Sequence, residues 1–191
     1  MDPMLSQVLS QFRLIGKPVS CERYGCGHIN VTYLVVTDAG LRYILQKINN
    51  HVFPNVPKLQ ENIAAVTGHL RQQTQEKHGV LTLIPTLDGA TYYYEEAAGY
   101  WRIYDFIEDS ICLQLPETPE DFYQSAIAFG TFQQQLKDFP AHRDLPFPAF
   151  RRSFQKTLLR GNIPPLTYLK ATVFHRSYAV LYRTLPQPQH I

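Results

Sequence analysis

Two glycines lie close together between two predicted strands, in the segment Gly25-Cys26-Gly27-His28. Glycine lets the backbone approach a bound group closely and point its N–H groups at an anion such as a phosphate. A pair of glycines between strands is also what an ordinary hairpin uses. The segment is therefore a candidate phosphate-binding turn, and its chemistry depends on the residues that lie beside it.

Lys47 interrupts an otherwise apolar strand, and Glu61 follows in the first turns of the next predicted helix. An ammonium group within an apolar strand needs a polar partner. Protein kinases hold nucleotide phosphates with a strand lysine that is paired with a helix glutamate. The plainer alternatives are a solvated Lys47 at a sheet edge and a Glu61 that interacts only with the helix dipole.

Aromatic residues are frequent on the strand that precedes residues 108–110, and three of them are Trp101, Tyr104 and Phe106. They could form the walls of a pocket for a nucleotide base. Aromatic residues on an apolar strand are also ordinary core residues, and this alternative stays open.

The elements that would position these residues follow from period-2 and helical patterns. Strands are predicted at residues 19–24, 29–37, 41–48, 80–84, 91–95 and 100–107. A helix starts at an Asn55 cap with its apolar stripe on Leu59, Ile63, Val66 and Leu70, and a second starts at Thr118 with its stripe on Phe122, Ala126, Phe129, Phe132 and Leu136. The order predicts an α+β domain built on an antiparallel sheet of about five strands with one packed helix, followed by a helix and an irregular tail.

Taken in order, these pieces resemble the N-terminal half of the aminoglycoside phosphotransferase and choline kinase-like family, which has a protein kinase-like fold. The resemblance is closest to the N-acetylhexosamine 1-kinase branch and covers about residues 5–150. The matching segments are Gly25-Cys26-Gly27-His28-Ile29-Asn30, Tyr43-Ile44-Leu45-Gln46-Lys47-Ile48-Asn49, Glu61-Asn62-Ile63, Tyr100-Trp101-Arg102 and Phe129-Gly130.

The resemblance implies a nucleotide site for ATP with Mg²⁺. The residues that it assigns to the nucleotide are Gly25, Gly27, His28, Asn30, Thr32, Lys47, Glu61, Tyr104, Phe106 and Ile107. Within this set it places the phosphates over residues 25–30 and on Lys47, lets Glu61 orient Lys47, and places adenine near Tyr104 and Ile107. It also implies phosphoryl transfer to a sugar hydroxyl, with an amino sugar as the substrate in the full-length relative.

The catalytic half of this family pattern is not found in the sequence. The family uses a His-x-Asp-x-x-x-x-Asn loop and a later metal-binding Asp, and the one partial match is His142-Arg143-Asp144-Leu145. Ala149 stands where the Asn should be, so we read this segment as a surface turn. We therefore assign no catalytic residue and no metal ligand, and we expect the chain to be an inactive, truncated kinase that is able to bind nucleotide.

Charge divides the chain sharply. Residues 1–144 hold all 16 acidic residues and 11 basic ones, a net charge of −5, whereas residues 145–191 hold 7 basic residues and no acid. We expect a nucleotide-binding lobe at 1–108, a linker and first helix at 109–150, and a basic tail at 151–191 that is frameshifted or poorly ordered. The alternative is a stand-alone binding module that uses the basic, aromatic tail for nucleic acid or a protein, and nucleic acid is the less expected partner.

Other classes of protein fit the sequence less well. No apolar run approaches the ~18 residues of a membrane span, and the first residues lack a signal core, so we expect a cytoplasmic protein. A zinc site would use Cys21, Cys26, His28 and either His51 or Cys112, but the spacing is poor for a structural site. We also expect exposed apolar surface on the second helix, with self-association as a consequence.

Overall fold

The computed structural model describes residues 1–25, 27, 29–74, 79–108 and 118–139. The chain divides into two compact units, Met1–Glu108 and Asp109–Ile191, and each is considered by itself. The basic tail expected at residues 151–191 and the segment around His142 lie outside the described residues. None of the described helices is long and apolar enough to cross a membrane.

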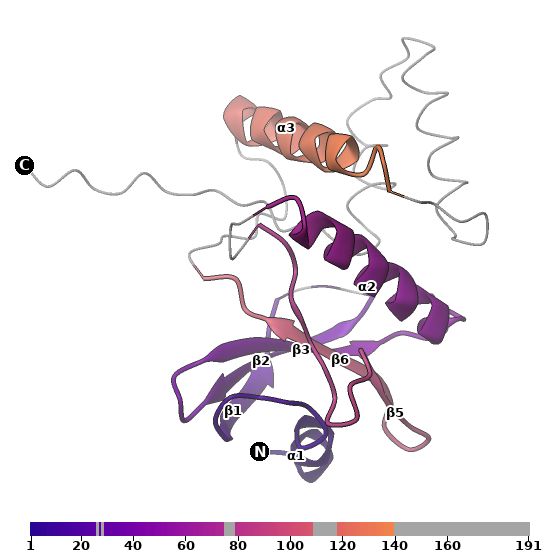
Figure 1. The fold of residues 1–191 in the computed structure, drawn as a ribbon. Helices are drawn as coiled ribbons and strands as arrows, with labels where there is room; N and C mark the ends of the chain where they lie inside the picture. Colours follow the sequence, from indigo (N-terminus) through magenta and orange to yellow (C-terminus); the bar gives the residue numbers. More distant parts are fainter. Residues whose placement is uncertain (26, 28, 75–78, 109–117, 140–191) are drawn as a thin grey trace, which may run out of the picture. The chain divides into compact units, whose positions relative to one another are not determined.

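A six-stranded antiparallel sheet forms the centre of the first unit (Figure 1). Its strands are β1 (Pro18–Arg23), β2 (Val31–Thr37), β3 (Arg42–Ile48), β4 (Leu83–Ile84), β5 (Tyr93–Glu95) and β6 (Gly99–Asp105). The order is β1-β2-β3-β6-β4, with β5 pairing with β6. The α+β class and the antiparallel sheet are confirmed, with six strands where about five were expected.

Alternating side chains give β3 two distinct faces, because successive residues of a strand point to opposite sides of a sheet. Tyr43 and Leu45 point to one side and Ile44 and Ile48 to the other, and all four are buried. A strand that is buried on both faces lies in the middle of a layered structure. β3 is therefore the central strand, between β2 and β6.

Helix α1 (Pro3–Leu9) covers the face that carries Tyr43 and Leu45, which we call the α1 face. Its buried residues Leu5, Val8 and Leu9 join Trp101 and Ile103 of β6 in one core cluster. Asp2 caps the helix by accepting N–H bonds from Met4 and Leu5. The sequence pattern missed this helix because 7 residues are too few to show a helical period.

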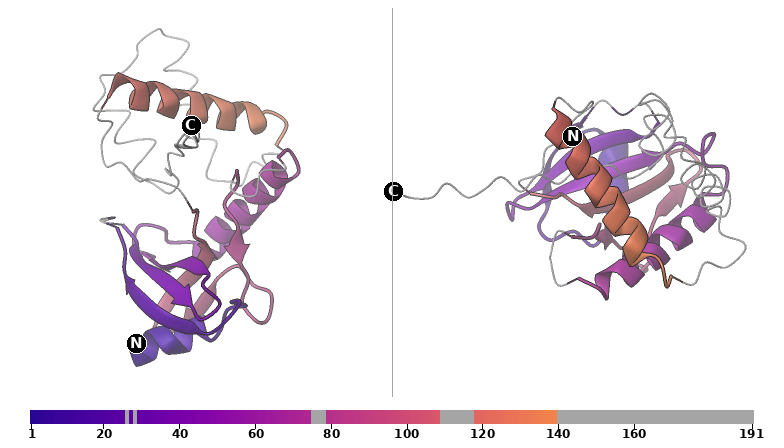
Figure 2. Two further views of the ribbon diagram at one scale, coloured as in Figure 1. Left: turned by 90° about the vertical axis from the view of Figure 1, so that its left-hand side faces the viewer. Right: turned by 90° about the horizontal axis from the view of Figure 1, so that it is seen from above.

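Helix α2 (Val56–Arg71) lies on the opposite side of the sheet from α1 (Figures 1 and 2), and we call this side the α2 face. The Asn55 cap is confirmed, since its side chain accepts the N–H of Lys58. Ile63 and Leu70 of the expected stripe are buried, whereas Leu59 and Val66 are only half-buried. The buried stripe is rotated because Val56 and Gln60 take the inward positions.

Helix α3 (Pro119–Gln135) is the described part of the second unit. Thr118 and Asp121 form a capping box, as the sequence predicted. The expected stripe is not covered: Phe122 is 38% exposed, and the described residues of α3 include one buried side chain, Ser125.

Strand β1 is one edge of the sheet, since β2 is the one strand of the described residues that pairs with it. Its pairing with β2 shifts register between Pro18 and Ser20, so that Val19 bulges outward and is 62% exposed. Glu22 and Arg23 at its other end are exposed charges. The opposite edge is formed by the short strands β4 and β5.

Candidate functional site

The glycine turn joins β1 to β2, and the space beside Gly25, its first glycine, is open. Gly25 has a φ of 71°, which favours glycine, and a Cβ at this position would meet no other atom within 4 Å. Asn30 fixes the end of the turn, because its Oδ1 accepts the N–H of Asn49 at 3.0 Å. Cys26 and His28 lie outside the described residues, so the role expected for His28 stays a prediction.

A row of three polar side chains crosses the α2 face just behind this turn. Thr32, Gln46 and Arg102 are register partners on the adjacent strands β2, β3 and β6. The Gln46 Nε2 donates to Thr32 Oγ1 at 3.0 Å, and the Gln46 Oε1 accepts from Arg102 Nε at 3.1 Å and from Arg102 Nη2 at 2.8 Å. We call these three residues the polar row.

Arg102 is the buried end of the polar row. It is 3% exposed, and its Nη1 has no hydrogen-bond partner. Among the described residues no carboxylate forms an ion pair with it, since the pairs present are Arg42–Glu108, Lys58–Glu61 and Lys137–Asp138. A buried guanidinium without a counter-charge is energetically costly, so this position is suited to an anionic ligand.

Lys47 does not lie on this face. It is the register partner of Trp101, whose side chain belongs to the α1 core cluster. The Lys47 Nζ lies 5.6 Å from the centre of the Trp101 ring, and its Cε lies 3.3 Å from where a Cβ of Gly99 would stand. The Lys47 side chain therefore lies against β6 on the α1 face. This is the face expected for it, because Lys47 is two residues from Leu45 on β3 and alternate residues of a strand share a face.

The expected pairing of Lys47 with Glu61 is not formed in the structure. The Glu61 carboxylate is 67% exposed and pairs with Lys58 at 3.3 Å, one turn earlier on α2. The physical reason is helical phase: Gln60 and Ile63 occupy the inward side of α2, which turns Glu61 outward. The plainer alternative, a solvated helix glutamate, describes Glu61 as it stands.

The linker that follows β6 is tied to the sheet at several points. Phe106 N–H donates to Arg42 O at 3.1 Å, and Glu108 forms a two-point salt bridge with Arg42. The Arg42 guanidinium lies 4.3 Å from the centre of the Phe106 ring, and Tyr24 meets the same ring edge-on at 5.9 Å. The glycine turn and the linker therefore approach each other through Tyr24 and Phe106. Tyr104 and Ile107, the other expected base contacts, flank Phe106 and are half-buried.

Metal binding finds no support in the described part of the chain, where no three His, Cys, Asp or Glu side chains come together as ligands. Burial raises the pKa of the Cys21 thiol to about 11, so the thiolate that a zinc site needs is disfavoured. Cys26, His28 and Cys112 of the alternative zinc site lie outside the described residues. The described residues likewise offer no cluster for Mg²⁺, and no step is derived through that ion.

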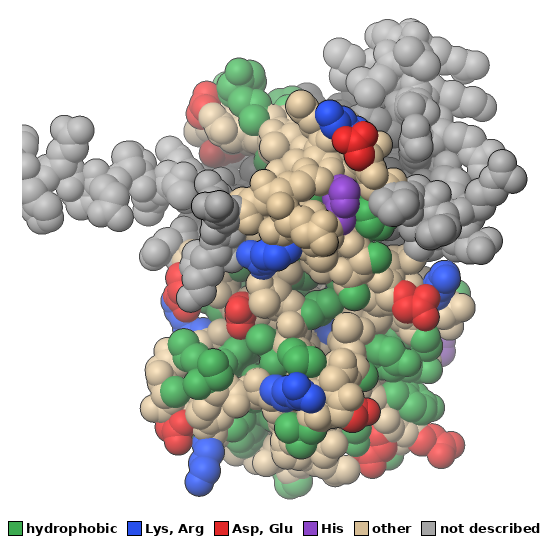
Figure 3. Space-filling model, in the orientation of Figure 1, with side chains coloured by type: hydrophobic (Ala, Val, Ile, Leu, Met, Phe, Trp, Pro, Cys, Tyr) green, Lys and Arg blue, Asp and Glu red, His purple; other side chains and the backbone are tan. Residues whose placement is uncertain are grey.

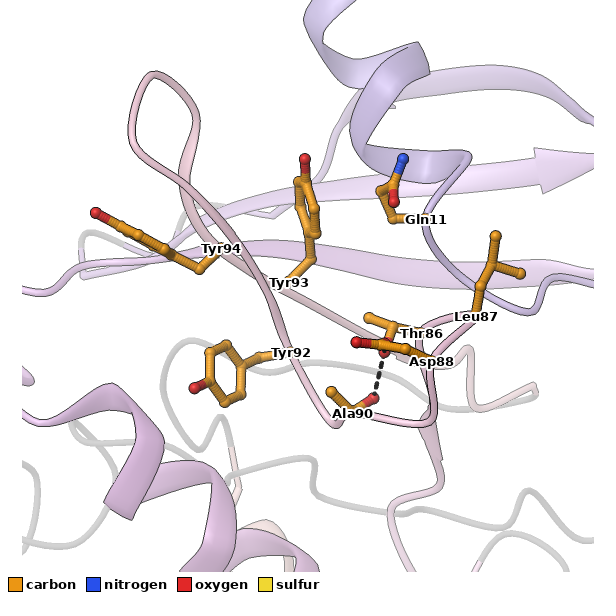
Figure 4. Close-up of a pocket in the computed structure, with 8 residues that line it drawn as sticks. All are labelled: Gln11, Thr86, Leu87, Asp88, Ala90, Tyr92, Tyr93 and Tyr94. Carbon is orange, nitrogen blue, oxygen red and sulfur yellow. Dashed lines mark hydrogen bonds between the residues drawn. The ribbon is translucent and has the colours of Figure 1, made fainter.

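A pocket of about 480 Å³ lies beside the end of α1 (Figure 4). Its lining residues are Gln11, Thr86, Leu87, Asp88, Ala90, Tyr92, Tyr93 and Tyr94. Asp88 accepts a hydrogen bond from the Thr86 hydroxyl, which is the main cause of its lowered pKa. None of the residues expected to bind nucleotide lines this pocket.

No protein-family model matches the chain. Among solved structures, it resembles an aminoglycoside phosphotransferase from Alicyclobacillus acidocaldarius subsp. acidocaldarius DSM 446, with 16% identity, a TM-score of 0.53, and coverage of 86% of this chain and 45% of that one. It also resembles a microcompartment-associated aminopropanol kinase, with 16% identity, a TM-score of 0.57, and coverage of 74% and 42%.

A third similar structure is an amicoumacin kinase in complex with AMP-PNP and Ca²⁺, with 13% identity, a TM-score of 0.48, and coverage of 73% and 41%. The chain spans less than half the length of each of these three proteins. The first two likenesses show that the chain has a kinase-like fold. The finer resemblance to the N-acetylhexosamine branch stays a prediction.

The sequence interpretation missed Gln46 and Arg102 as site residues, although both lie in segments that carry the resemblance. The signal for Arg102 was present: it is a cation between Trp101 and Ile103 in an apolar strand, the same feature that singled out Lys47. What the sequence did not show was on which face of the sheet each cation lies.

Proposed function

We propose that residues 1–108 bind the phosphates and base of ATP as the nucleotide-binding lobe of a small-molecule phosphotransferase. The observation that carries this proposal is the polar row, which crosses the sheet face opposite the α1 core and begins at Thr32, close in sequence to the glycine turn, where the space beside Gly25 is open. Because α1 and its core cluster fill the α1 face, we place the ligand on the α2 face, where the polar row lies. The kinase-like fold of the similar structures supports this assignment.

Each part of the site has a distinct task in this proposal. Backbone N–H groups near Gly25 and Gly27 bind phosphate oxygens, and Asn30 keeps the turn in place. The Phe106 ring, which already contacts Tyr24 and Arg42, offers a surface on which the base can stack. Tyr104 and Ile107 complete the base site as the resemblance implies.

The acceptor of the phosphoryl group is proposed from the resemblance alone. An amino-sugar hydroxyl fits the branch that the sequence resembles most. Phosphoryl transfer also requires a carboxylate near that hydroxyl and metal ligands. The described residues supply neither, so the function proposed for this chain is nucleotide binding, and transfer is proposed only for a chain that carries the remaining groups.

A nucleic-acid-binding function is not favoured. The residues on which it depends, in the tail at 151–191, lie outside the described part. On the face seen in Figure 3, the Lys and Arg side chains of the described residues are scattered among hydrophobic and acidic ones and form no continuous basic patch. Binding of a long polyanion requires such a patch or stripe.

Calorimetric titration of the full chain with ATP and with adenosine tests the proposal. We expect ATP to bind and Phe106→Ala to weaken both ligands by about 5- to 100-fold, since stacking of a base on an aromatic ring contributes ~1–3 kcal/mol. Tyr94→Ala is the matched control, because Tyr94 is 51% exposed and lines the pocket beside α1. If Tyr94→Ala abolishes binding and Phe106→Ala does not, the nucleotide binds elsewhere and the proposal is wrong.

A further inference from the structure

We propose that Arg102, positioned by Gln46, is the cation that binds phosphate on the α2 face, and that Lys47 has no part in this contact. The inference rests on the proposed nucleotide function and names the residue that recognises its charged end. It departs from the arrangement implied by the sequence, in which a strand lysine and a helix glutamate do this work.

Strand parity is the first step. Lys47 and Arg102 are the only cations among the described residues of β3 and β6 besides Arg42, which is engaged with Glu108. Lys47 points to the α1 face, against Trp101 and over Gly99. Arg102 points to the α2 face with Thr32 and Gln46. Moving Lys47 to the α2 face would require a one-residue slip of β3, which would move every side chain of the strand to the opposite face of the sheet.

Charge balance is the second step. Arg102 is buried and has no carboxylate partner among the described residues. Two of its three nitrogens bond to a single neutral oxygen, Gln46 Oε1, and Nη1 has no partner. A bound anion would supply the missing charge and give Nη1 an acceptor. Proteins pair or neutralise buried charges, so an unpaired one is a strong sign of a ligand.

The choice of glutamine at position 46 is the third step. Its Nε2 donates to Thr32 Oγ1, which turns its Oε1 toward Arg102 and holds the guanidinium in one orientation. A glutamate of the same shape would hold Arg102 equally well but would neutralise it. Gln46 is therefore a positioning residue that fixes Arg102 and leaves its charge available.

Helix α2, which covers this face, adds two more unpaired polar groups. Gln60 is 0% and Asn62 3% exposed, and neither amide has a hydrogen-bond partner. Together with Arg102 Nη1, these are the buried side-chain atoms without a partner in the described part of the chain. Gln60 lies on the inward side of α2 with Val56 and Ile63, whereas Asn62, two residues further on, points to a different side of the helix. The Gln60 amide is therefore the one that faces the sheet, and its N–H₂ group is a donor that phosphate oxygens accept.

The ligand class that fits is a phosphate group, whose oxygens match the planar, multi-donor guanidinium. Two sources carry this chemistry: the phosphates of a nucleotide, and free inorganic phosphate or polyphosphate. ATP, adenosine and tripolyphosphate separate them, because adenosine has the base alone and tripolyphosphate the charge alone.

Gln46→Glu is the decisive variant because the substitution is nearly isosteric and places a carboxylate on Arg102. We expect the melting temperature of this variant without ligand to rise. Its affinity for ATP and tripolyphosphate should fall by about 10-fold or more, since a charge-assisted hydrogen bond is worth ~1.5–3 kcal/mol. Its affinity for adenosine should change by less than about 2-fold. Arg102→Met should lose the same affinities. Lys47→Met, matched in size and charge change, should bind all three ligands within about 2-fold of the wild type.

The outcomes separate the inference from the function on which it rests. If Lys47→Met loses ATP affinity and Gln46→Glu does not, or if ATP binding survives in both Gln46→Glu and Arg102→Met, the inference is overturned while nucleotide binding stands. A third outcome is that the wild type does not bind ATP, while tripolyphosphate raises the melting temperature of the wild type and not that of Arg102→Met. In that case the proposed nucleotide function is wrong and the anion site stands. If neither ligand acts on the wild type, both are wrong. Should Arg102→Met fail to fold, the Gln46→Glu result decides alone.

Discussion

At the scale of single residues, β3 and β6 place a glycine where no other residue fits well. Gly99 has a φ of 81°, and a Cβ there would lie 3.3 Å from the Lys47 Cε. We expect Gly99→Ala to lower the free energy of unfolding by about 1–3 kcal/mol, because a side chain at positive φ is strained. Urea unfolding followed by circular dichroism measures the change.

Gly68 supplies the control for this prediction. It lies inside α2, is exposed, and has open space where a Cβ would stand. Gly68→Ala should therefore raise the free energy of unfolding by about 0.5–1 kcal/mol, since alanine loses less backbone entropy in a helix. Equal effects of the two substitutions would contradict the assigned backbone conformation of Gly99.

Cys21 gives a second prediction, on pH. Burial raises its pKa to about 11, so in the folded protein the thiol should react with iodoacetamide only slowly until the pH nears that value. A Cys26→Ser, Cys112→Ser variant isolates the signal, and the same variant unfolded in urea should titrate near the usual ~8.5. Because the folded pKa is the higher one, this group's contribution to stability is complete below the unfolded pKa and falls as the pH rises toward 11. Rapid alkylation of folded protein at pH 8.5 would contradict the burial of Cys21.

The residue scale also shows where sequence reasoning stops. The glycine turn, the Asn55 cap and the capping box at Thr118 depend on neighbours in sequence, and the structure has the two caps as predicted. Whether Lys47 or Arg102 faces the ligand depends on strand parity relative to α1, and α1 was itself not visible in the pattern. The expected Lys47–Glu61 pair is also absent from the structure because it depended on packing: the side of α2 that faces the sheet is decided by which residues pack inward.

At the scale of elements, α2 carries a buried amide that a core helix would not ordinarily hold. Gln60 is fully buried and both of its polar atoms lack partners. We expect Gln60→Leu to raise the free energy of unfolding by about 1–3 kcal/mol, because an unsatisfied buried polar group costs that much. If the amide serves the phosphate, ATP affinity should fall in the same variant.

Gln72 is the matched control for Gln60. It closes α2 at its C-terminal end and is exposed. Gln72→Leu should change the free energy of unfolding by less than about 0.5 kcal/mol, as surface substitutions usually do. A loss of stability in Gln60→Leu larger than that of the control would show that the Gln60 amide has a partner in the folded protein.

The elements themselves were largely predictable. The strands of the sheet and both long helices lie where alternation and apolar stripes predicted, with ends differing by a few residues. The exceptions have physical causes: α1 is too short to show a period, and β4 and β5 are shorter than their predicted segments because only parts of residues 80–84 and 91–95 pair with β6. The stripe of α2 rotated because Gln60 sits inside the core.

At the scale of the whole molecule, the first unit contains the cover for both faces of its sheet. Helix α1 and its core lie on one face and α2 on the other. Glu108, the last residue of the unit, forms a salt bridge with Arg42 of β3. We therefore expect a fragment of residues 1–108 to fold alone, with a cooperative thermal transition by circular dichroism. The comparison is the full chain in the same buffer.

A fragment that aggregates or melts without cooperativity would contradict this view of the first unit. It would instead favour the exposed apolar surface expected from the sequence, with self-association as its result. Light scattering during the melt distinguishes the two outcomes, because a self-associating fragment grows in size before it unfolds.

The two edges of the sheet have a consequence for growth. Strand β1 leaves one side of its backbone unpaired, and an unpaired strand can accept another strand from a second chain. Here the shift of register after Pro18 bends that edge, and Glu22 and Arg23 place exposed charges along it. At the other edge, β4 and β5 are two and three residues long, too short to template a strand. Charge and a bend at one edge, and the small number of residues at the other, therefore disfavour the addition of a strand from a second chain.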